Sequence, residues 1–276
     1  MEKKSRNNNS KSIKNGQLGS RRVVIIIALV LFLVFIFHFI MPAGYTLEGD
    51  KKVKSDLNSL NNYIKSLDGG KIDSAISKAN FDIKLKKVDG NQGKLDNRFV
   101  FSNSALVGDS MAEGIVDYGI LDSSNVFAKR GKRLSTSKDL FNQAINASPK
   151  HLFIEFGMND IIAYRGKVQP FIDEYKGVLR DLKKKLPNSK LYVVSISTIS
   201  QLGIKNKPSM QNFTGYNSAM KKMCKEENVT FVDTTLLLDS NSGYEFDGIH
   251  PKEPFYSNWV KLMCSYILEY ISNSEV

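Results

Sequence analysis

The stretch Ala-Leu-Val-Gly-Asp-Ser-Met-Ala-Glu-Gly, residues 105–114, decides how the chain is organised. Its apolar start has the length of a buried strand, and the residues after Ser110 are compatible with a helix. Ser110 is therefore predicted on a strand-to-helix turn at the carboxyl edge of a sheet, where a nucleophile would be exposed beside free helix N–H groups. Gly, Asp and Ser are also common in ordinary turns and N-caps, so the rest of the chain must decide between these readings.

The composition fits a folded domain with additions. A chain of 276 residues that is 42% hydrophobic can bury a full core, which excludes a disordered protein. The net charge is +11, but residues 1–22 carry +6 of it and leave only +5 for the remaining 254. Because the excess charge is concentrated in this tail, we expect no nucleic-acid partner.

Residues 23–40 contain no charged side chain and would span about 27 Å as a helix. Lys and Arg precede this run, whereas Glu48 and Asp50 follow it, so the N-terminus is predicted in the cytoplasm and the remainder outside. The pattern predicts an uncleaved signal-anchor helix at residues 23–41 and a single-pass protein of the cell membrane. The alternative is a cleaved secretory signal, which the length of the apolar run and the sequence Met41-Pro42-Ala43 disfavour.

Residues 42–102 are predicted to form a stalk or linker with a short helix. Apolar residues recur there in steps of three and four: Val53, Leu57, Leu60, Ile64 and Leu67. This seam favours a helix that either pairs into a homodimer or folds back on the globular domain. Further along, alternating apolar residues at 81–85 and the apolar run 99–101, with turn residues between them, permit a hairpin.

From residue 103 to 276, strand-length apolar runs alternate with helical stretches. The predicted strands are residues 105–107, 126–128, 152–156, 191–196 and 229–232. The predicted helices are the stretch after Ser110 and residues 137–146, 168–186, 213–227 and 254–271. This alternation predicts an α/β fold with a five-stranded parallel sheet and helices on both faces, that is, three layers.

Polar residues gather where these strands end, and ligands bind at the carboxyl edge of such sheets. Ser110 follows the first strand, Gly131 the second and Asn159 the third, and Asp247 and His250 precede the last helix. We therefore expect these residues to converge on one rim.

The chain has three histidines, of which only one can serve Ser110 as a base. His38 lies in the predicted membrane span, and His151 begins a strand at its opposite end. Asp247 can accept the Nδ1–H of His250 and direct Nε2 at the serine, as a catalytic triad requires. The alternative for this pair is an ordinary Asp-Gly turn with His250 at the start of a helix.

These residues resemble the SGNH, or GDSL-type, serine hydrolases over about residues 103–272. The resemblance rests on four blocks in order: Gly-Asp-Ser at 108–110, Gly131, Gly-Met-Asn-Asp at 157–160 and Asp-Gly-Ile-His at 247–250. It implies a flavodoxin-like three-layer sandwich. Many members carry a hydroxyl residue at the position of Ala112, a departure that concerns substrate contacts.

The resemblance also implies the roles of the site residues. Ser110 would be the nucleophile, His250 the base and Asp247 its orienting partner. The N–H groups of Ser110 and Gly131 and the side-chain amide of Asn159 would form the oxyanion hole. The reaction would proceed through an acyl-enzyme without a metal or organic cofactor.

The substrate expected for an anchored extracytoplasmic member is an acylated carbohydrate, with acetyl or another short acyl group removed from cell-wall or exported polysaccharide. Three alternatives remain open: transfer of acetyl onto such glycans, hydrolysis of lipids or thioesters, and a non-catalytic surface module. A basic cluster beside the pocket glycine could attract an anionic substrate or simply be solvated: Lys129, Arg130, Lys132 and Arg133. Cys224 and Cys264 could form a disulfide or remain as buried thiols.

Overall fold

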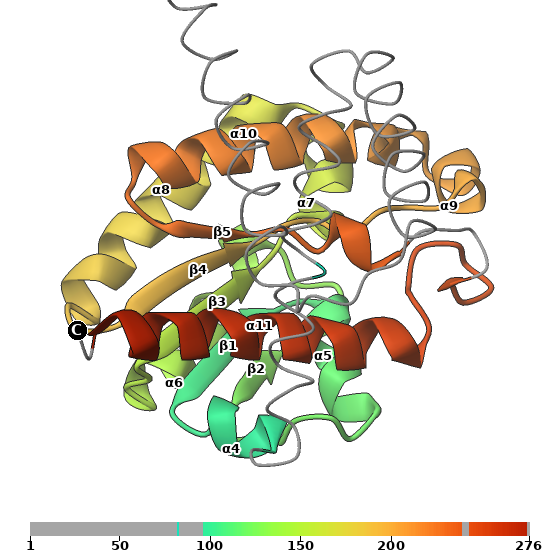
Figure 1. The fold of residues 1–276 in the computed structure, drawn as a ribbon. Helices are drawn as coiled ribbons and strands as arrows, with labels where there is room; N and C mark the ends of the chain where they lie inside the picture. Colours follow the sequence, from blue (N-terminus) through green and yellow to red (C-terminus); the bar gives the residue numbers. More distant parts are fainter. Residues whose placement is uncertain (1–81, 83–95, 239–242, 275–276) are drawn as a thin grey trace, which may run out of the picture. The chain divides into compact units, whose positions relative to one another are not determined.

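A computed structural model describes residues 82, 96–238 and 243–274 of the chain (Figure 1). The chain divides into two units, Met1–Ile72 and Asp73–Val276. The predicted basic tail, membrane span and apolar stalk seam all lie outside the described residues. Within the described residues, no helix is long and apolar enough to cross a membrane.

The centre of the second unit is a five-stranded parallel sheet with the order β2-β1-β3-β4-β5. Its strands are β1 (Ser104–Gly108), β2 (Val126–Ala128), β3 (His151–Glu155), β4 (Lys190–Val194) and β5 (Thr230–Val232). The five predicted strands are confirmed, with ends that differ by up to two residues. At the carboxyl edge Gly108 is paired with Ala128 on one side and with Glu155 on the other.

The strands read as continuous apolar runs because both faces of the sheet are covered. Every residue of β1 and β3 is buried, and Leu106, Val107, Phe153 and Ile154 have no exposed surface. A strand with one solvent-facing side would instead alternate polar and apolar residues. The core therefore lies on both sides of the central strands.

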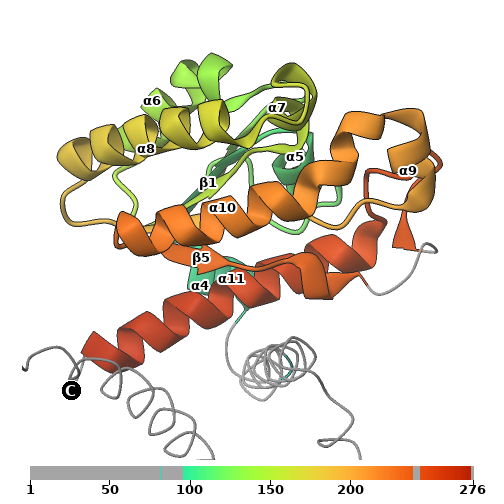
Figure 2. The same cartoon turned by 90° about the horizontal axis from the view of Figure 1, so that it is seen from above.

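Helices α6, α8 and α10 cover one face of the sheet, and α5 and α11 cover the other (Figures 1 and 2). The bounds of these five helices are α5 (Ser110–Asp117), α6 (Lys138–Asn146), α8 (Val168–Lys185), α10 (Phe213–Glu226) and α11 (Glu253–Ser274). All five were predicted from the sequence. Helix α8 buries Phe171, Tyr175, Leu179 and Leu182, a spacing that keeps one apolar stripe on the sheet.

Several short elements connect the large ones and were not predicted. They are α7 (Met158–Ala163), α9 (Gln201–Asn206) and the 3₁₀ turns η1 (Leu134–Thr136), η2 (Pro208–Asn212) and η3 (Thr235–Leu237). Each is six residues or fewer, too short to display a helical repeat of apolar residues.

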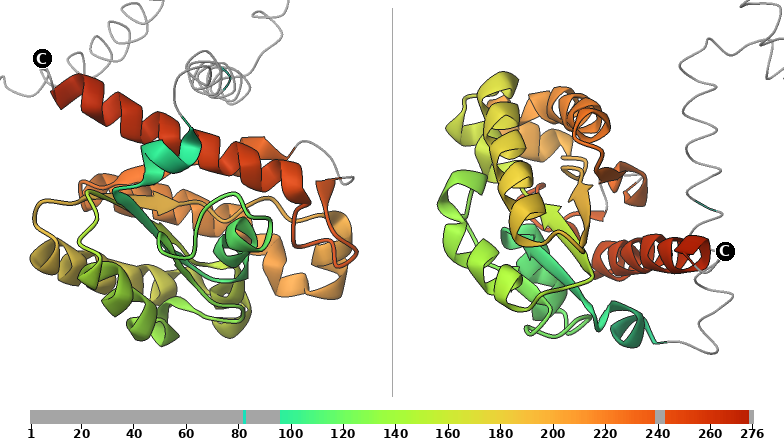
Figure 3. Two further views of the ribbon diagram at one scale, coloured as in Figure 1. Left: turned by 90° about the horizontal axis from the view of Figure 1, so that it is seen from below. Right: turned by 90° about the vertical axis from the view of Figure 1, so that its left-hand side faces the viewer.

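The predicted hairpin strand at residues 99–101 is wrong, because Asn97–Phe101 form helix α4. Asp96 caps this helix by accepting a hydrogen bond from the N–H of Arg98 at 3.2 Å. Phe101 is buried and stacks on Phe153 with 5.7 Å between ring centroids. Helix α4 lies against α11, so residues before 103 take part in the packing of the domain (Figure 3). The other arm, residues 81–85, lies outside the described residues apart from Asp82.

Cys224 and Cys264 are both buried free thiols. Burial raises the pKa of each thiol to about 12, so neither is ionised near neutral pH. Of the two alternatives, the structure therefore has the buried thiols.

Candidate active site

Ser110 is the first residue of α5, and one residue, Asp109, separates it from the end of β1. Asp109 caps the helix, because its carboxylate accepts the N–H of Met111 at 2.9 Å. The turn is tight: a Cβ on Gly108 would lie 2.5 Å from the Cβ of Ala112, so only glycine fits. The N–H of Ser110 has no hydrogen-bond partner among the described residues and remains available beside the serine oxygen.

The structure brings together Ser110, His250 and Asp247, although the serine and the histidine are 140 residues apart in sequence. Ser110 Oγ lies 3.0 Å from His250 Nε2. On the other side of the ring, His250 Nδ1 lies 2.5 Å from Asp247 Oδ2. These two contacts orient the imidazole with one nitrogen on the carboxylate and the other on the hydroxyl.

A short hairpin holds the histidine and the aspartate in this arrangement. Tyr244 and Pro251 form an antiparallel bridge, and the N–H of Glu245 donates to the carbonyl of His250 at 2.7 Å. The turn is fixed from α9, because Ser200 Oγ donates to the Gly248 carbonyl at 2.7 Å. Gly248 has φ +71°, and an added Cβ would lie 2.4 Å from that Oγ, so glycine is required there.

The Asp247 carboxylate is held in its charged form. Burial works to raise its pKa, but hydrogen bonds from the His250 ring and from the N–H groups of Ile249 and His250 lower it overall. Asp247 therefore faces the imidazole as an anion, and it can stabilise the positive charge that the ring gains on taking a proton.

Gly131 lies in the loop after β2, next to the Ser110 turn. The loop is tied to α5, because Arg130 donates to Glu113 at 2.9 Å and also pairs with Asp117. Gly131 has φ +75°, a conformation that favours glycine. Its N–H has no partner among the described residues, and a Cβ there would meet open space. The backbone at this position can therefore approach a ligand.

Two of the four basic residues of this loop already have acidic partners. Arg130 is paired as described above, and Lys132 Nζ lies 2.8 Å from Asp139. These ion pairs reduce the positive charge that the loop offers to a substrate.

Asn159 lies at the start of α7, and its side-chain amide faces the same region. Its Nδ2 donates to Asp109 Oδ2 and to the carbonyl oxygen of Lys132, both at 3.0 Å. An amide group has two N–H donors, so both are directed at protein acceptors in this structure. A substrate oxyanion would have to share or replace one of these acceptors.

Three buried carboxyl groups lie near this site without a role predicted from the sequence, and one of them, Asp109, contacts Asn159. Asp109 and Asp160 have no exposed surface and Glu155 has 3%. Burial raises the pKa of Asp109 to about 6 and of Asp160 to about 7, and burial together with the Asp109 charge raises that of Glu155 well above its usual value. The signal in the sequence is Glu155 itself, a carboxyl at the end of an apolar strand. Among the described residues, no group of three or more His, Cys, Asp or Glu could hold a metal ion.

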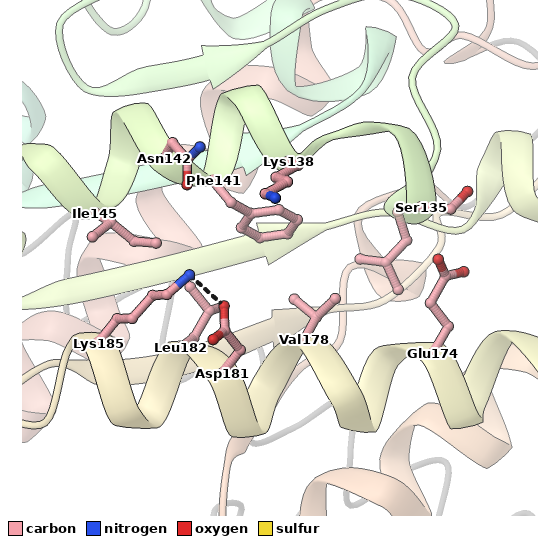
Figure 4. Close-up of a pocket in the computed structure, with 11 residues that line it drawn as sticks. Ser135, Lys138, Phe141, Asn142, Ile145, Glu174, Val178, Asp181, Leu182 and Lys185 are labelled. Carbon is pink, nitrogen blue, oxygen red and sulfur yellow. Dashed lines mark ion pairs between the residues drawn. The ribbon is translucent and has the colours of Figure 1, made fainter.

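A surface groove runs between α6 and α8, away from these residues (Figure 4). Its floor contains Phe141 and Leu182, and its rim includes the ion pair of Asp181 and Lys185 at 2.8 Å. The groove is not lined by Ser110, Asp247 or His250, so an ester would not meet the serine there.

The family model of the GDSL-like lipases and acylhydrolases matches residues 102–257, more than half of the chain. The chain belongs to this family. As a GDSL-like acylhydrolase, it is a serine hydrolase that acts on ester bonds. The matched range contains all four sequence blocks and begins at the end of α4.

Solved structures of other proteins share this fold. A GDSL-like lipase from Bacteroides thetaiotaomicron is 18% identical, with a TM-score of 0.50 over 67% of this chain and 98% of that one. A protein from Streptococcus pneumonia assigned as a platelet activating factor is 16% identical, with a TM-score of 0.51 over 71% and 98%. A protein from Bacteroides fragilis assigned as an acylhydrolase is 19% identical, with a TM-score of 0.50 over 61% and 87%. No curated protein sequence matches the chain. At these identities the likeness concerns the fold alone.

Proposed function

We propose that Ser110, His250 and Asp247 form the catalytic triad of an esterase that acts outside the membrane on acylated polysaccharide. One observation carries the triad assignment. The imidazole of His250 lies within hydrogen-bond distance of both partners, 3.0 Å from the serine oxygen and 2.5 Å from the carboxylate. This is the geometry that converts a weak hydroxyl into a nucleophile.

The reaction follows from these contacts. His250 Nε2 takes the Ser110 proton as Oγ attacks the ester carbonyl, and Asp247 stabilises the imidazolium that forms. When the tetrahedral intermediate collapses, the imidazolium donates this proton to the leaving alcohol, and the acyl group stays on the serine. Water then attacks the acyl-enzyme by the same route in reverse and releases the carboxylic acid.

The negatively charged oxygen of the tetrahedral intermediate needs hydrogen-bond donors to stabilise it. We propose that the free N–H groups of Ser110 and Gly131 supply two of them and that the Asn159 amide supplies the third. Because the Asn159 amide donates to Asp109 and Lys132 in this structure, it would redirect or share one N–H as charge develops on the substrate. A donor of this kind contributes about 3 to 4 kcal/mol to the transition state.

The proposed substrate is a glycan that carries acetyl or another short acyl group in the cell wall or an exported polysaccharide. The basic residues before the proposed anchor at residues 23–41, and Glu48 and Asp50 after it, support this location. Two exposed apolar side chains near the His250 turn support a substrate larger than the acyl group: Phe246, which directly precedes Asp247 and is 94% exposed, and Leu202, which lies close to Gly248 and is 48% exposed. An exposed aromatic ring offers an apolar face to the C–H groups of a sugar.

Acetate release tests this function. Full-length protein is incubated with a panel of acetylated glycans and p-nitrophenyl esters, with and without an acceptor sugar, and Ser110→Ala is the control. We expect wild-type turnover of an activated acetyl ester and of at least one acetylated glycan, and no turnover by the control. Acetyl transfer to the acceptor sugar without free acetate would replace hydrolysis by acetyl transfer. A preference for long-chain lipid esters would overturn the glycan proposal.

The proposed location has a separate test. Protease added to intact cells should digest the domain after residue 50, and the mature protein should retain residues 23–40. A mature N-terminus near residue 44 would instead mean a secreted enzyme without an anchor.

A further inference from the structure

Glu155 lies beneath the Ser110 turn, in contact with the residue that precedes the serine. Its position opposite Gly108 in the sheet register places its carboxyl over that glycine, where an added Cβ would lie 2.9 Å from Glu155 Oε2. The same oxygen accepts the N–H of Asp109 in a long hydrogen bond of 3.4 Å. A charged residue that is 3% exposed needs a partner, yet no Lys, Arg or His forms an ion pair with Glu155 or Asp109 within the described residues.

The buried carboxyl groups of Glu155 and Asp109 lie beside each other at this turn, and two buried carboxylates in contact would repel each other. One of them must hold a proton. The pKa of Asp109 is raised to about 6, and burial together with the Asp109 charge raises that of Glu155 well above its usual value. The proton therefore stays on Glu155 at neutral pH, and the O–H of Glu155 donates to the Asp109 carboxylate.

Asp109 connects Glu155 to the proposed oxyanion hole through its own hydrogen bonds. Its Oδ1 accepts the Met111 N–H at the start of α5, and its Oδ2 accepts the Asn159 amide at 3.0 Å. We propose that Glu155, as a neutral acid, is a positioning residue that holds the Asp109 carboxylate and, through it, both the Ser110 turn and the Asn159 amide. This inference rests on the proposed roles of Ser110 and Asn159, and Glu155 itself does not touch the substrate.

The test uses full-length protein and compares Glu155→Gln with Glu155→Leu. Gln keeps a neutral N–H donor for Asp109, whereas Leu fills the space without one. We expect kcat for p-nitrophenyl acetate to stay within about threefold of wild type in E155Q and to fall about 10-fold to 100-fold in E155L, with little change in KM. Rates are expressed per active serine, counted with a fluorophosphonate, so that loss of folded protein does not count as loss of kcat.

The pH dependence of kcat separates this role from a purely structural one, because a purely structural role of Glu155 would leave the pH dependence unchanged. Other titratable groups face this pair, namely Asp160, Tyr175, Tyr256 and His250. All of them remain in both variants. Without the Glu155 hydrogen bond the pKa of Asp109 rises, so Asp109 loses its charge at higher pH. We expect the acid limb of kcat to move up by about one pH unit in E155L and to stay in place in E155Q.

The control is Ser104→Ala, at the amino end of β1. The Ser104 hydroxyl is buried and has no hydrogen-bond partner among the residues that the structure describes, so we expect the kcat of this variant to equal that of the wild type. Equal losses in E155Q and E155L, or wild-type kcat and pH profile in E155L, would overturn the inference while leaving the triad intact.

A second measurement does not depend on activity. The infrared difference between wild type and E155Q at pH 7 should contain the carbonyl band of a protonated carboxylic acid. An ionised Glu155 at that pH would overturn the inference even if no ester substrate were turned over, whereas failure of the proposed esterase function appears as an inactive wild type.

Discussion

The two ends of the β-sheet each have a histidine beside them, and the two histidines have opposite surroundings. His151 begins β3, is 4% exposed and contacts the Tyr192 hydroxyl at 3.0 Å through Nδ1. Burial, aided by Lys150 and Lys190, lowers its pKa and keeps it neutral. His250, at the carboxyl end, has a carboxylate on one nitrogen and a serine on the other. Both histidines thus contact a hydroxyl group, but among the described residues only His250 also has a carboxylate on its other nitrogen, which can stabilise the positive charge of a general base.

Removing each histidine in turn tests whether His250, and not His151, acts as the base. His250→Ala should lower kcat by about 10⁴-fold or more, and Ser110→Ala should match it and also abolish fluorophosphonate labelling. His151→Ala should keep near-normal kcat per folded molecule. An inactive but folded His151→Ala beside an active His250→Ala would make the site assignment wrong.

Asp247→Asn tests whether the anion behind His250 matters. The amide keeps the size of the side chain but favours the wrong imidazole tautomer, so kcat should fall about 10⁴-fold. KM for a small ester should change little. A variant within tenfold of wild type would remove the orienting role of Asp247.

Asn159→Ala extends the comparison to the proposed oxyanion donor. We expect kcat to fall by about 10²-fold to 10³-fold without a matching change in KM, because the hydrogen bond strengthens as charge develops on the carbonyl oxygen. A change confined to KM would mean that Asn159 binds the ground state only.

Two exposed phenylalanines provide a matched pair for substrate size. Phe246→Ala should lower kcat/KM for an acetylated glycan about tenfold and leave kcat/KM for p-nitrophenyl acetate unchanged. Phe246 directly precedes Asp247 in the sequence, and its ring would contact the sugar. Phe99→Ala, on α4 and 68% exposed, should change neither. Equal effects of the two variants would refute a sugar contact at Phe246.

Asp160→Asn is expected to have the smallest effect on activity and a measurable effect on stability. Its pKa is raised to about 7 in the folded state, so folding favours the protonated form, and the free energy of unfolding falls as pH rises from about 4 to about 7. Asparagine removes this loss of stability at neutral pH, which is at most about 4 kcal/mol. Its side-chain carbonyl can still accept the Leu134 N–H. Thermal melts between pH 5 and 8 should show a flatter pH dependence in the variant. An unchanged slope would mean that Asp160 is ionised throughout.

The large elements of the fold could be predicted from the sequence because both faces of the sheet are buried. The central residues of β1 and β3, 105–107 and 152–154, are all apolar, and the apolar stripe of α8 is long enough to repeat several times. The strand predicted at residues 99–101 was wrong because the segment 97–101, with three apolar residues in five, fits a strand as well as a helix. The deciding contacts, the Asp96 cap and the packing of Phe101 on Phe153, join residues that no local pattern connects.

The candidate site was predictable to a similar extent. The structure brings Ser110, Asp247 and His250 into contact, as the positions of the strand ends predict. The sequence could not indicate that both N–H groups of Asn159 donate to protein acceptors, nor that the buried Glu155 carboxyl contacts the Asp109 backbone. Both properties depend on burial and on distances across three strands and loops.

The separation of 140 residues between Ser110 and His250 has a consequence for how the protein is made. At typical rates of synthesis, the histidine follows the serine by roughly 7 to 28 seconds. Helix α11 must then pack over α5: an added Cβ on Gly114 of α5 would lie 2.7 Å from the ring of Tyr256 in α11. If the proposed triad is correct, a growing chain, or one that stops before residue 247, carries an ordinary alcohol at Ser110 and cleaves no ester until its C-terminal part is complete.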